Sequence, residues 1–258
     1  MLVLPVPCLF DNFSYLLVCE ATRTCAIIDP CEYYPVSTAL NQHQLKPCAI
    51  FCTHHHRDHI DGIEDILEEY PDDVPVYGHE SDEGRIPAMT HPLIDQDVVT
   101  VGQLNGKVYH TPGHTRGSSL YHFDGALFTG DTLFGAGCGR LFEGTAKQMY
   151  HSLAKIIELF APEVKIYPGH DYTRANLEFA RSLEPANRAI IQRLAYESTA
   201  VKGAEGWVPS DLALELATNP FLRCGQSAIL FAAQKVEPNM DGTPEEVFRV
   251  IRQMKDNA

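Results

Sequence analysis

The sequence predicts a mixed α/β domain followed by a smaller all-helical domain. Up to about residue 170, short apolar or β-branched runs alternate with turn-rich connections, which is typical of segments that form sheets. From Tyr172 onward these runs give way to segments with helical periodicity. A chain of 258 residues is long enough for a large domain with a smaller appendage. We therefore expect an α/β domain over 1–173 and a helical domain over 174–258.

The elements of the first domain follow from its apolar patterns. Five runs predict strands: SYLLV at 14–18, CAIID at 25–29, AIFCT at 49–53, PVYG at 75–78 and ALFTGD at 126–131. The segment GIEDILEEY at 62–70 predicts a helix after the third run. Another helix is predicted from Ala146, because apolar residues there recur at spacings that line one face: Met149, Leu153, Ile156, Ile157 and Phe160.

The second domain is predicted to contain helices only. Helical segments are expected around 173–183, 186–200, 210–217, 226–234 and 244–256. Pro185 and Pro244 stand where a proline often begins a helix.

Composition excludes several classes of function. A net charge of -14 argues against binding nucleic acid, because phosphate backbones are held chiefly by lysine and arginine. No run approaches the roughly 20 apolar residues of a membrane span, and the N-terminus lacks a basic leader. The eight cysteines form no CxxC pairs, so we expect reduced, mostly packed thiols. These features favour a cytoplasmic monomer without nucleic-acid or membrane partners.

The stretch THHHRDHIDG, residues 53–62, places four histidines within six positions and adds a carboxylate at Asp58. It follows the predicted strand AIFCT, and loops at strand ends commonly carry functional residues. His54 and His56 are spaced to point to one side of an extended backbone, while Asp58 and His59 face a neighbouring point. Imidazole and carboxylate together suit zinc, iron or manganese.

Three further residues fit the same chemistry. His114 follows a Pro-Gly turn in HTPGHT, Asp131 ends the apolar run in LFTGDT, and His170 ends another in IYPGHDY. With the first motif, five histidines and two aspartates exceed the four ligands of one tetrahedral ion. The sequence therefore predicts two metal ions that share one carboxylate.

The other histidines are expected to have ordinary surface or core positions: His43, His79, His91, His122 and His151. His55 lies between two predicted ligands and should point away from them as a loop residue. His110 is the alternative to His114, but the Pro-Gly turn favours His114.

Other motifs are weaker. GAGCGR at 135–140 resembles a glycine-rich phosphate loop but lacks the third glycine of GxGxxG, so we interpret it as a flexible loop beside the metals. The sequence contains no GxSxG motif, and no cysteine has an evident activating neighbour. Metal-bound water is therefore the expected nucleophile.

The motifs THHHRDHIDG, TPGHT, FTGDTLF and YPGHDY, in this order, resemble those of the metallo-β-lactamase superfamily over residues 1 to about 173. GCGRLFEGT (137–145), GHDYTRANLEFA (169–180), NPFLRC (219–224) and Arg252 followed by KD at 255–256 resemble glyoxalase II, the hydroxyacylglutathione hydrolases. The resemblance implies an αββα sandwich with a two-metal site, and an all-helical C-terminal domain that helps to bind glutathione.

The resemblance also implies roles for single residues. The first metal would be held by His54, His56 and His114, and the second by Asp58, His59 and His170, with Asp131 bridging the two. Asp58 and Asp131 would be the catalytic carboxylates, together with a bridging hydroxide. The contacts to glutathione would be made by Arg140, Phe142, Tyr172, Arg252 and Lys255. Arg140 and Phe142 stand where many members have lysine and tyrosine, and Phe142 lacks the hydroxyl that a tyrosine would offer.

The implied reaction is hydrolysis of S-(2-hydroxyacyl)glutathione, such as S-D-lactoylglutathione, to glutathione and D-lactate, the second step of methylglyoxal detoxification. The implied cofactors are two divalent metal ions, zinc in the first place, with iron or manganese as alternatives. Two competing hypotheses are a glutathione persulfide dioxygenase that uses one iron and oxygen, and a non-catalytic metal-binding protein of the same fold. The complete HxHxDH set and the long helical segment favour hydrolysis.

Overall fold

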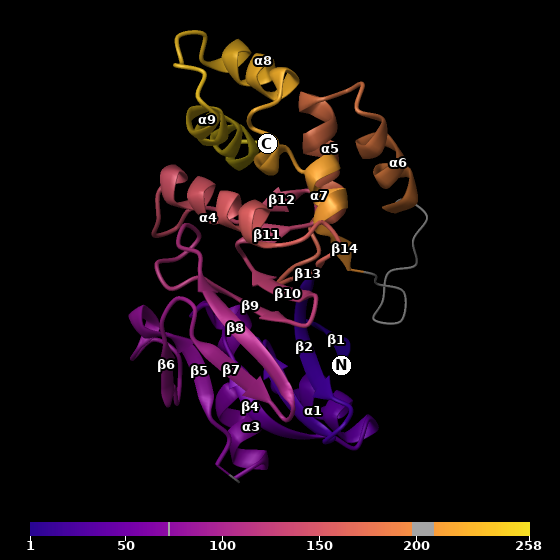
Figure 1. The fold of residues 1–258 in the computed structure, drawn as a ribbon, viewed down its shortest axis with the longest axis vertical. Coiled ribbons are helices and arrows are strands. Elements are labelled where there is room, and N and C mark those ends of the chain that lie inside the picture. The colour runs from indigo at the N-terminus through magenta and orange to yellow at the C-terminus, as the bar shows by residue number, and fades with distance from the viewer. Residues whose placement is uncertain (72, 198–208) are drawn as a thin grey trace.

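The computed structural model describes residues 1–71, 73–197 and 209–258, and within these ranges two six-stranded sheets pack face to face (Figure 1). Helices cover the outer faces of both sheets, which confirms the predicted αββα sandwich. Further helices gather at one end of the molecule, beside α4 (Ala146–Leu159) and away from the N-terminal sheet.

The first sheet uses the N-terminal part of the chain. Its strands, in spatial order, are β1 (Leu2–Cys8), β2 (Asn12–Cys19), β3 (Thr24–Ile28), β4 (Lys46–Phe51), β5 (Val76–His79) and β6 (His91–Leu93). The first three strands pair antiparallel, and β3 to β6 run parallel. All residues of β2 are buried, as expected where both faces of a sheet are covered.

The second sheet brings distant segments together. Its spatial order is β14 (Ser210–Asp211), β13 (Lys165–Pro168), β10 (Ala126–Gly130), β9 (Ser119–Phe123), β8 (Leu104–His110) and β7 (Val98–Val101). β10 and β13 pair in parallel, with Gly130 opposite Pro168. The loops that follow these two strands therefore leave the sheet at the same edge.

The helices of the α/β part are α1 (Tyr33–Gln42), α2 (Arg57–Ile60), α3 (Ile63–Glu69), the short 3-10 helix η1 (Glu80–Asp82) and α4. One buried cluster packs α1 and α3 against the first sheet, and an aromatic-rich cluster fills the space between the sheets, including Tyr15, Phe51, Tyr121 and Phe128. These cores hold the strand ends in place.

The C-terminal helices are α5 (Thr173–Leu183), α6 (Arg188–Glu197), α7 (Leu212–Thr218), η2 (Pro220–Leu222), α8 (Ser227–Val236) and α9 (Pro244–Asp256). All of them except α6 share one buried cluster with α4 and the second sheet, so Phe221 and Phe248 lie in the same core as Met149 and Leu127. The division at residue 173 thus remains a prediction, because the two parts bury apolar surface against each other.

Most predicted helices have the expected bounds. The segments 173–183 and 244–256 match α5 and α9, and α7 and α8 are shifted by one or two residues. Pro244 begins α9, as predicted, and the Thr243 side chain caps it. The expected start at Pro185 is wrong: α6 begins at Arg188, where the Asn187 side chain accepts a hydrogen bond from the Ala189 N–H at 3.0 Å. Residues 198–200 of that predicted helix lie outside the described residues.

Two smaller expectations need correction. In α4, Met149, Leu153 and Ile156 are buried, but Ile157 is 38% exposed, because it lies one residue beyond the buried face. The segment GAGCGR is not an open flexible loop. Its first residues close a short buried hairpin, β11 (Leu133–Phe134) and β12 (Gly137–Cys138).

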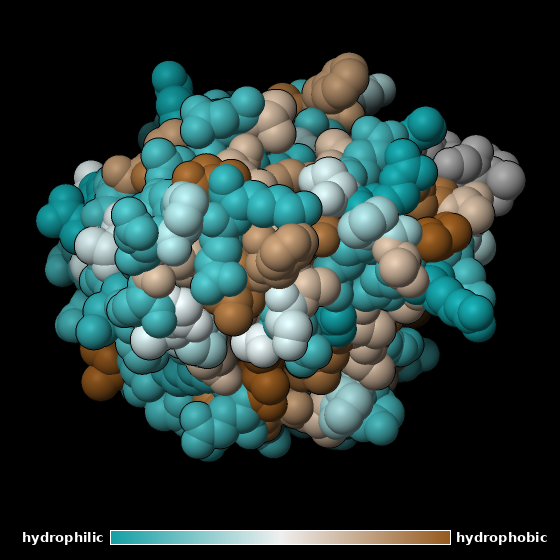
Figure 2. All heavy atoms as spheres, turned by 90° about the horizontal axis from the view of Figure 1, so that it is seen from above, coloured by the Kyte–Doolittle hydropathy of each residue, from teal (hydrophilic) through white to brown (hydrophobic). Residues whose placement is uncertain are grey.

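Figure 2, which views the molecule from above, shows a mostly hydrophilic surface with hydrophobic residues in small separate groups. None of the helices in the described ranges is long and apolar enough to cross a membrane. All eight cysteines are free, and every one except Cys48 is buried, which confirms the expected reduced thiols.

Candidate metal centre and substrate pocket

All seven predicted ligand residues meet at one edge of the sandwich. His54 and His56 follow β4, Asp58 and His59 lie on α2, and the others come from loops after β8, β10 and β13: His114, Asp131 and His170. The parallel pairing of β10 with β13 is what places Asp131 and His170 side by side. The predicted assembly from strand ends is therefore what the fold produces.

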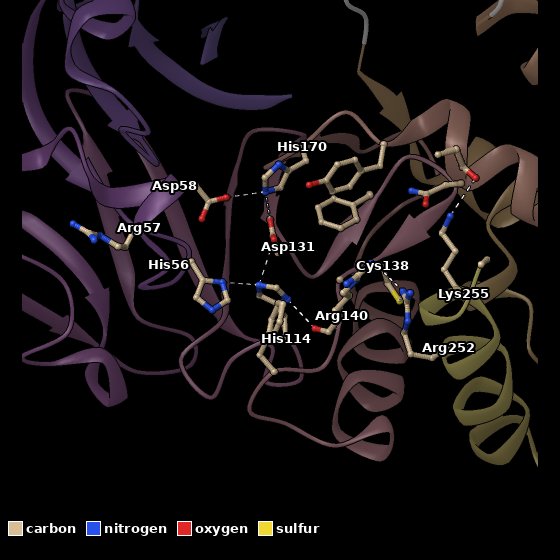
Figure 3. Close-up of a pocket in the computed structure, with 17 residues that line it drawn as sticks. His56, Arg57, Asp58, His114, Asp131, Cys138, Arg140, His170, Arg252 and Lys255 are labelled. Carbon is tan, nitrogen blue, oxygen red and sulfur yellow. Dashed lines mark hydrogen bonds and ion pairs between the residues drawn. The ribbon is translucent and has the colours of Figure 1, made fainter. Parts of the chain in front are cut away.

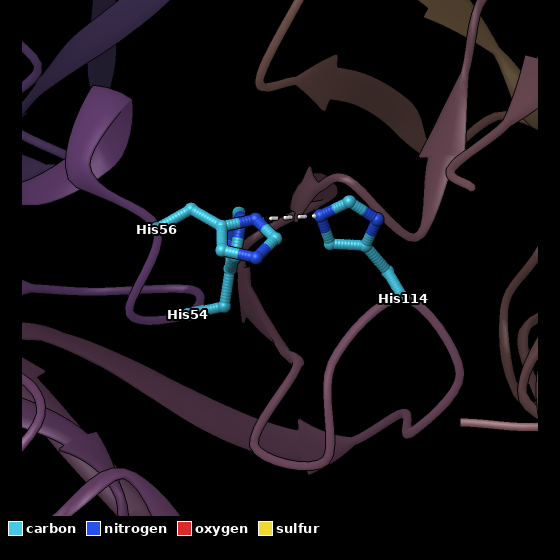
Figure 4. A group of neighbouring side chains, drawn as sticks. All are labelled: His54, His56 and His114. Carbon is cyan, nitrogen blue, oxygen red and sulfur yellow. Dashed lines mark hydrogen bonds between the residues drawn. The ribbon is translucent and has the colours of Figure 1, made fainter. Parts of the chain in front are cut away.

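Three imidazoles form the first set. His56 Nδ1 lies 3.1 Å from His54 Nε2 and 2.9 Å from His114 Nε2. Figure 4 shows the three rings turned toward one another from two separate loops. His54 and His114 are buried, and His56 is partly exposed. Ring nitrogens this close, directed at one point, suit a shared cation.

The second set lies beside the first. His59 Nε2 and His170 Nε2 are 3.3 Å apart, and Asp58 Oδ2 lies 3.3 Å from His170 Nε2 and 3.7 Å from His59 Nε2. The ligand atoms of Asp58, His59 and His170 all lie within 4.8 Å of one another. Two nitrogens and a carboxylate oxygen thus face one point.

Asp131 lies between the two sets. Its Oδ2 is 3.3 Å from His114 Nε2, and its Oδ1 is 3.3 Å from His59 Nε2 and 3.5 Å from His170 Nε2. Oδ1 is buried and has no hydrogen-bond partner in the described part of the chain. A buried carboxylate oxygen that makes no hydrogen bond but faces two ligand imidazoles fits a site that takes cations.

The electrostatics divide the two sets. Burial lowers the pKa of His54 and His114 and lowers that of His56 to about 4, so these imidazoles are neutral at pH 7. Burial also opposes charge on His59 and His170, but facing carboxylates raise both pKa values, that of His170 to about 10. The same contacts hold the pKa of Asp131 well below its ordinary value. A metal ligand must be a neutral imidazole, so a divalent ion bound at the second set would take the place of the protons that these carboxylates favour on His59 and His170.

Four ligand imidazoles have their outer nitrogen fixed. His54 Nδ1 contacts Thr53 Oγ1 at 3.0 Å, His114 Nδ1 contacts Arg140 O at 2.8 Å, and the outer nitrogens of the other two face carboxylates: Asp29 for His59 at 3.0 Å and Asp11 for His170 at 2.8 Å. Such partners orient metal ligands and set their tautomers.

Sequence reasoning missed these orienting residues. Asp29 is buried and also accepts hydrogen bonds from the Thr53 N–H and hydroxyl, both at 2.7 Å. Asn12 donates to Asp58 Oδ2 at 3.1 Å. A signal existed for Asp29, because it ends the apolar run CAIID just as Asp131 ends ALFTGD. Asp11 and Asn12 have no comparable pattern.

A pocket of about 650 Å³ opens from the metal centre toward the C-terminal helices (Figure 3). His56, Asp58, His114, Asp131 and His170 form its inner end. The five predicted glutathione-side residues all line it: Arg140, Phe142, Tyr172, Arg252 and Lys255. The pocket thus joins an acidic and imidazole-rich end to a wall that carries three cations.

These three cations differ in solvent exposure and in the protein partners that they already have. Arg252 is only 4% exposed; its Nη1 donates to Cys138 O at 2.8 Å and its Nη2 pairs with Asp256, which leaves Nε without a partner among the described residues. The Lys255 ammonium donates to Ala175 O at 3.2 Å. Arg140 is largely exposed. Arg252 is therefore a buried cation that already has protein partners, unlike Arg140.

Two aromatic residues flank the inner end of the pocket. Phe142 is 64% exposed and meets the rings of His56 and His114 edge to face, with centroid distances of 5.4 and 5.2 Å. Tyr172 stacks on His170 at 4.9 Å. Phe142 therefore presents an apolar face, and no hydroxyl, next to the ligand imidazoles.

The remaining histidines lie outside the ligand sets, as predicted. His55 points away and faces Asp82, with 3.1 Å between Nδ1 and Oδ1. His110, the alternative to His114, stacks on His79 at 3.9 Å between ring centroids. The structure thus places His114, and not His110, beside His54 and His56.

Comparison with known proteins agrees with this geometry. Residues 9–170 match the model of the metallo-β-lactamase superfamily, and residues 171–258 match that of the hydroxyacylglutathione hydrolase C-terminus. A hydroxyacylglutathione hydrolase of Gloeobacter violaceus is 46% identical over 99% of both chains. The chain belongs to the hydroxyacylglutathione hydrolase family. Another member, from Arabidopsis thaliana and named as cytoplasmic, is 40% identical over 99% of this chain and 98% of its own.

Solved structures extend the likeness beyond the hydroxyacylglutathione hydrolases. The structure of ETHE1 from Myxococcus xanthus has a TM-score of 0.66 and 27% identity, with 99% of this chain and 98% of that chain covered. A metallo-β-lactamase from Staphylococcus aureus has a TM-score of 0.65 at 23% identity and covers 99% of this chain, but 71% of its own. The second likeness shows the fold alone.

Proposed function

We propose that this protein hydrolyses S-(2-hydroxyacyl)glutathione thioesters, with S-D-lactoylglutathione as substrate. The observation that carries the proposal is Asp131, whose two buried oxygens face the ligand imidazoles of both sets at the inner end of a pocket lined by cations. Membership of the hydroxyacylglutathione hydrolase family supports the choice of substrate.

We propose two divalent ions, zinc in the first place, with iron or manganese as alternatives that the same ligands accept. His54, His56 and His114 would hold one ion, and Asp58, His59 and His170 the other, with Asp131 shared. When bound, such ions lower the pKa of water to about 7 and polarise the carbonyl to be attacked. The residues fit this role, because their lone pairs converge on two neighbouring points.

The chain's own residues bind and orient the thioester. The cations of Lys255, Arg140 and Arg252 lie along the pocket wall, where the glutathione carboxylates would reach them. The acyl end would then lie beside Asp58 and Asp131. The departing thiol has an ordinary pKa of about 8.5 and leaves as thiolate, so no acid has to be positioned beside the sulfur.

The proposal is tested by hydrolysis of S-D-lactoylglutathione with purified protein, before and after chelation and after metal return. We expect release of glutathione and D-lactate that chelator abolishes and zinc restores. Measurements with iron and manganese then rank the metals. Fully metallated protein that does not cleave the thioester would refute the proposal, and oxygen consumption with glutathione persulfide would instead support the dioxygenase hypothesis.

Replacing Lys255 by alanine is expected to raise the KM for S-D-lactoylglutathione roughly tenfold, with little change in kcat, because one charge-assisted contact to the substrate is lost. Steady-state kinetics measure both constants. Lys235→Ala is the matched control, because this α8 lysine lies outside the pocket. An unchanged KM would remove Lys255 from the binding site.

We further propose that the protein acts in the cytoplasm as a monomer. The cytoplasmic relative from Arabidopsis thaliana and the free, mostly buried thiols support the compartment. Sedimentation of the purified protein tests the monomer.

A further inference from the structure

A second charged cluster lies behind the histidine loop, on the side away from the metal centre. It consists of Asp82, Arg85 and Glu143, with His55 in contact with all three, and we call it the Asp82 cluster. Arg85 Nη1 donates to Asp82 Oδ1 at 3.2 Å and to Glu143 Oε2 at 3.3 Å. Arg85 Nη2 reaches both Glu143 Oε1 and His55 Nε2. One guanidinium thus joins two carboxylates and an imidazole.

Asp82 is the buried end of this cluster. It is fully buried, and its Oδ2 has no hydrogen-bond partner among the described residues. That oxygen lies against Gly117, where an added Cβ would come within 2.2 Å of it. An unsatisfied buried carboxylate oxygen opposes folding, so the cluster is maintained at a cost in stability. A cost of this kind is common where a side chain serves a site.

Glu143 connects the cluster to the loop that carries His114. Its Oε2 accepts a hydrogen bond from the Arg116 N–H at 2.9 Å. The backbone on either side is bonded to the same loop: the Phe142 N–H donates to His114 O at 3.1 Å, and the Gly144 N–H donates to Gly113 O at 3.1 Å. Glu143 and its neighbours therefore join their own loop to the loop that carries His114.

His55 connects the cluster to the loop that carries the other two imidazoles of the first set. It lies between His54 and His56, so fixing its ring also fixes the direction of its neighbours. His55 Nδ1 lies 3.1 Å from Asp82 Oδ1, and its Nε2 contacts Arg85 Nη2. Within the described ranges, a single backbone hydrogen bond joins the loop of His54 and His56 to the segment around His114, from the Ser119 N–H to Thr53 O at 2.9 Å.

We propose that Arg85, held between Asp82 and Glu143, is a positioning residue that fixes the separation of the two loops from which His54, His56 and His114 converge. The inference deepens the proposed function, because it concerns the first of the two proposed metal sets. Substitution of a residue that orients metal ligands commonly lowers the metal affinity by about 10- to 100-fold.

The test uses the full chain, freed of metal by chelation, and cobalt(II) chloride as the probe. Titration followed by visible absorption gives the affinity and the coordination spectrum without any substrate. Arg85→Met is expected to weaken binding of cobalt by about 10- to 100-fold and to change the spectrum at the first equivalent. Arg85→Lys keeps one charge but cannot form the fork to both carboxylates, so it should recover part of the affinity.

Arg249→Met is the matched control. Arg249 also lies between two carboxylates, Glu237 and Glu246, and its side chain is 37% exposed, compared with 33% for Arg85. It lies outside the pocket, so this variant should bind cobalt as the unmodified protein does. Thermal unfolding of the metal-free proteins measures how far each substitution affects the fold itself.

Wild-type affinity and spectrum in a folded Arg85→Met protein would overturn the proposal. Equal losses in Arg85→Met and Arg249→Met would also overturn it, because they would reflect general instability. If Arg85→Met does not fold, Glu143→Gln serves in its place, since it keeps the size of the side chain and removes the ion pair. Unmodified protein that binds cobalt but does not cleave the thioester would refute the proposed function and leave this test intact.

Discussion

Replacing Asp131 by alanine is expected to abolish metal loading and thioester hydrolysis together. The carboxylate faces His114 with one oxygen and His59 and His170 with the other, so its loss removes a ligand from both proposed ions. The metals would stabilise the transition state by several kcal/mol, and loss of that stabilisation corresponds to a kcat roughly a thousandfold lower, or more. Metal content by elemental analysis and turnover of S-D-lactoylglutathione measure the two effects.

The control for this substitution is Asp65→Ala, which removes an exposed carboxylate from α3. It should keep both metal and activity. An active Asp131→Ala protein with its full metal content would refute the bridging role. Loss of activity with full metal content would assign Asp131 to the reaction rather than to metal binding.

Asp29→Asn is expected to produce the second large effect, a metal affinity about 10- to 100-fold lower with a parallel loss of activity at limiting metal. Asp29 accepts hydrogen bonds from the Thr53 N–H and hydroxyl and faces His59 Nδ1. It therefore orients the His59 imidazole, which is one of the proposed ligands of the second set. An amide cannot accept all three. Titration of the metal-free protein with zinc against a competing chelator measures the affinity.

Asparagine is the appropriate replacement because Asp29 has a φ of 48°, a left-handed conformation that asparagine adopts more readily than most other residues. Asp124→Asn is the matched control: Asp124 has a φ of 39° but lies exposed in the turn between β9 and β10. Wild-type affinity in Asp29→Asn would show that His59 is held by its remaining neighbours.

Much of the fold could be predicted from local pattern. The runs around CAIID and ALFTGD became β3 and β10, and the segments 173–183 and 244–256 became α5 and α9. Each has a clear apolar period and a definite end, such as the Thr243 cap and Pro244. The helix start that was predicted from a single proline was wrong. Pro185 precedes α6 without beginning it, because the Asn187 side chain caps the helix instead.

The candidate ligands could also be predicted, because each is a metal-binding residue type in a short motif at the end of an apolar run. The orienting residues could not. Asp11, Asn12 and the Asp82 cluster act through contacts between loops far apart in the chain, such as His170 with Asp11 and Arg85 with Glu143. A single sequence does not show such pairs, because hydrogen-bond partners depend on which loops the sheets bring together.

The sequence by itself determined the candidate metal ligands, the alternation of strands and helices, and an acidic net charge that argues against a nucleic-acid partner. The tertiary structure decided how these residues are used. It placed Asp131 beside His170 through the parallel pairing of β10 and β13, and it buried Arg252 against Cys138. The reason is physical: residue type and period act within a few residues, whereas burial and orientation depend on segments that meet only when the sheets pack.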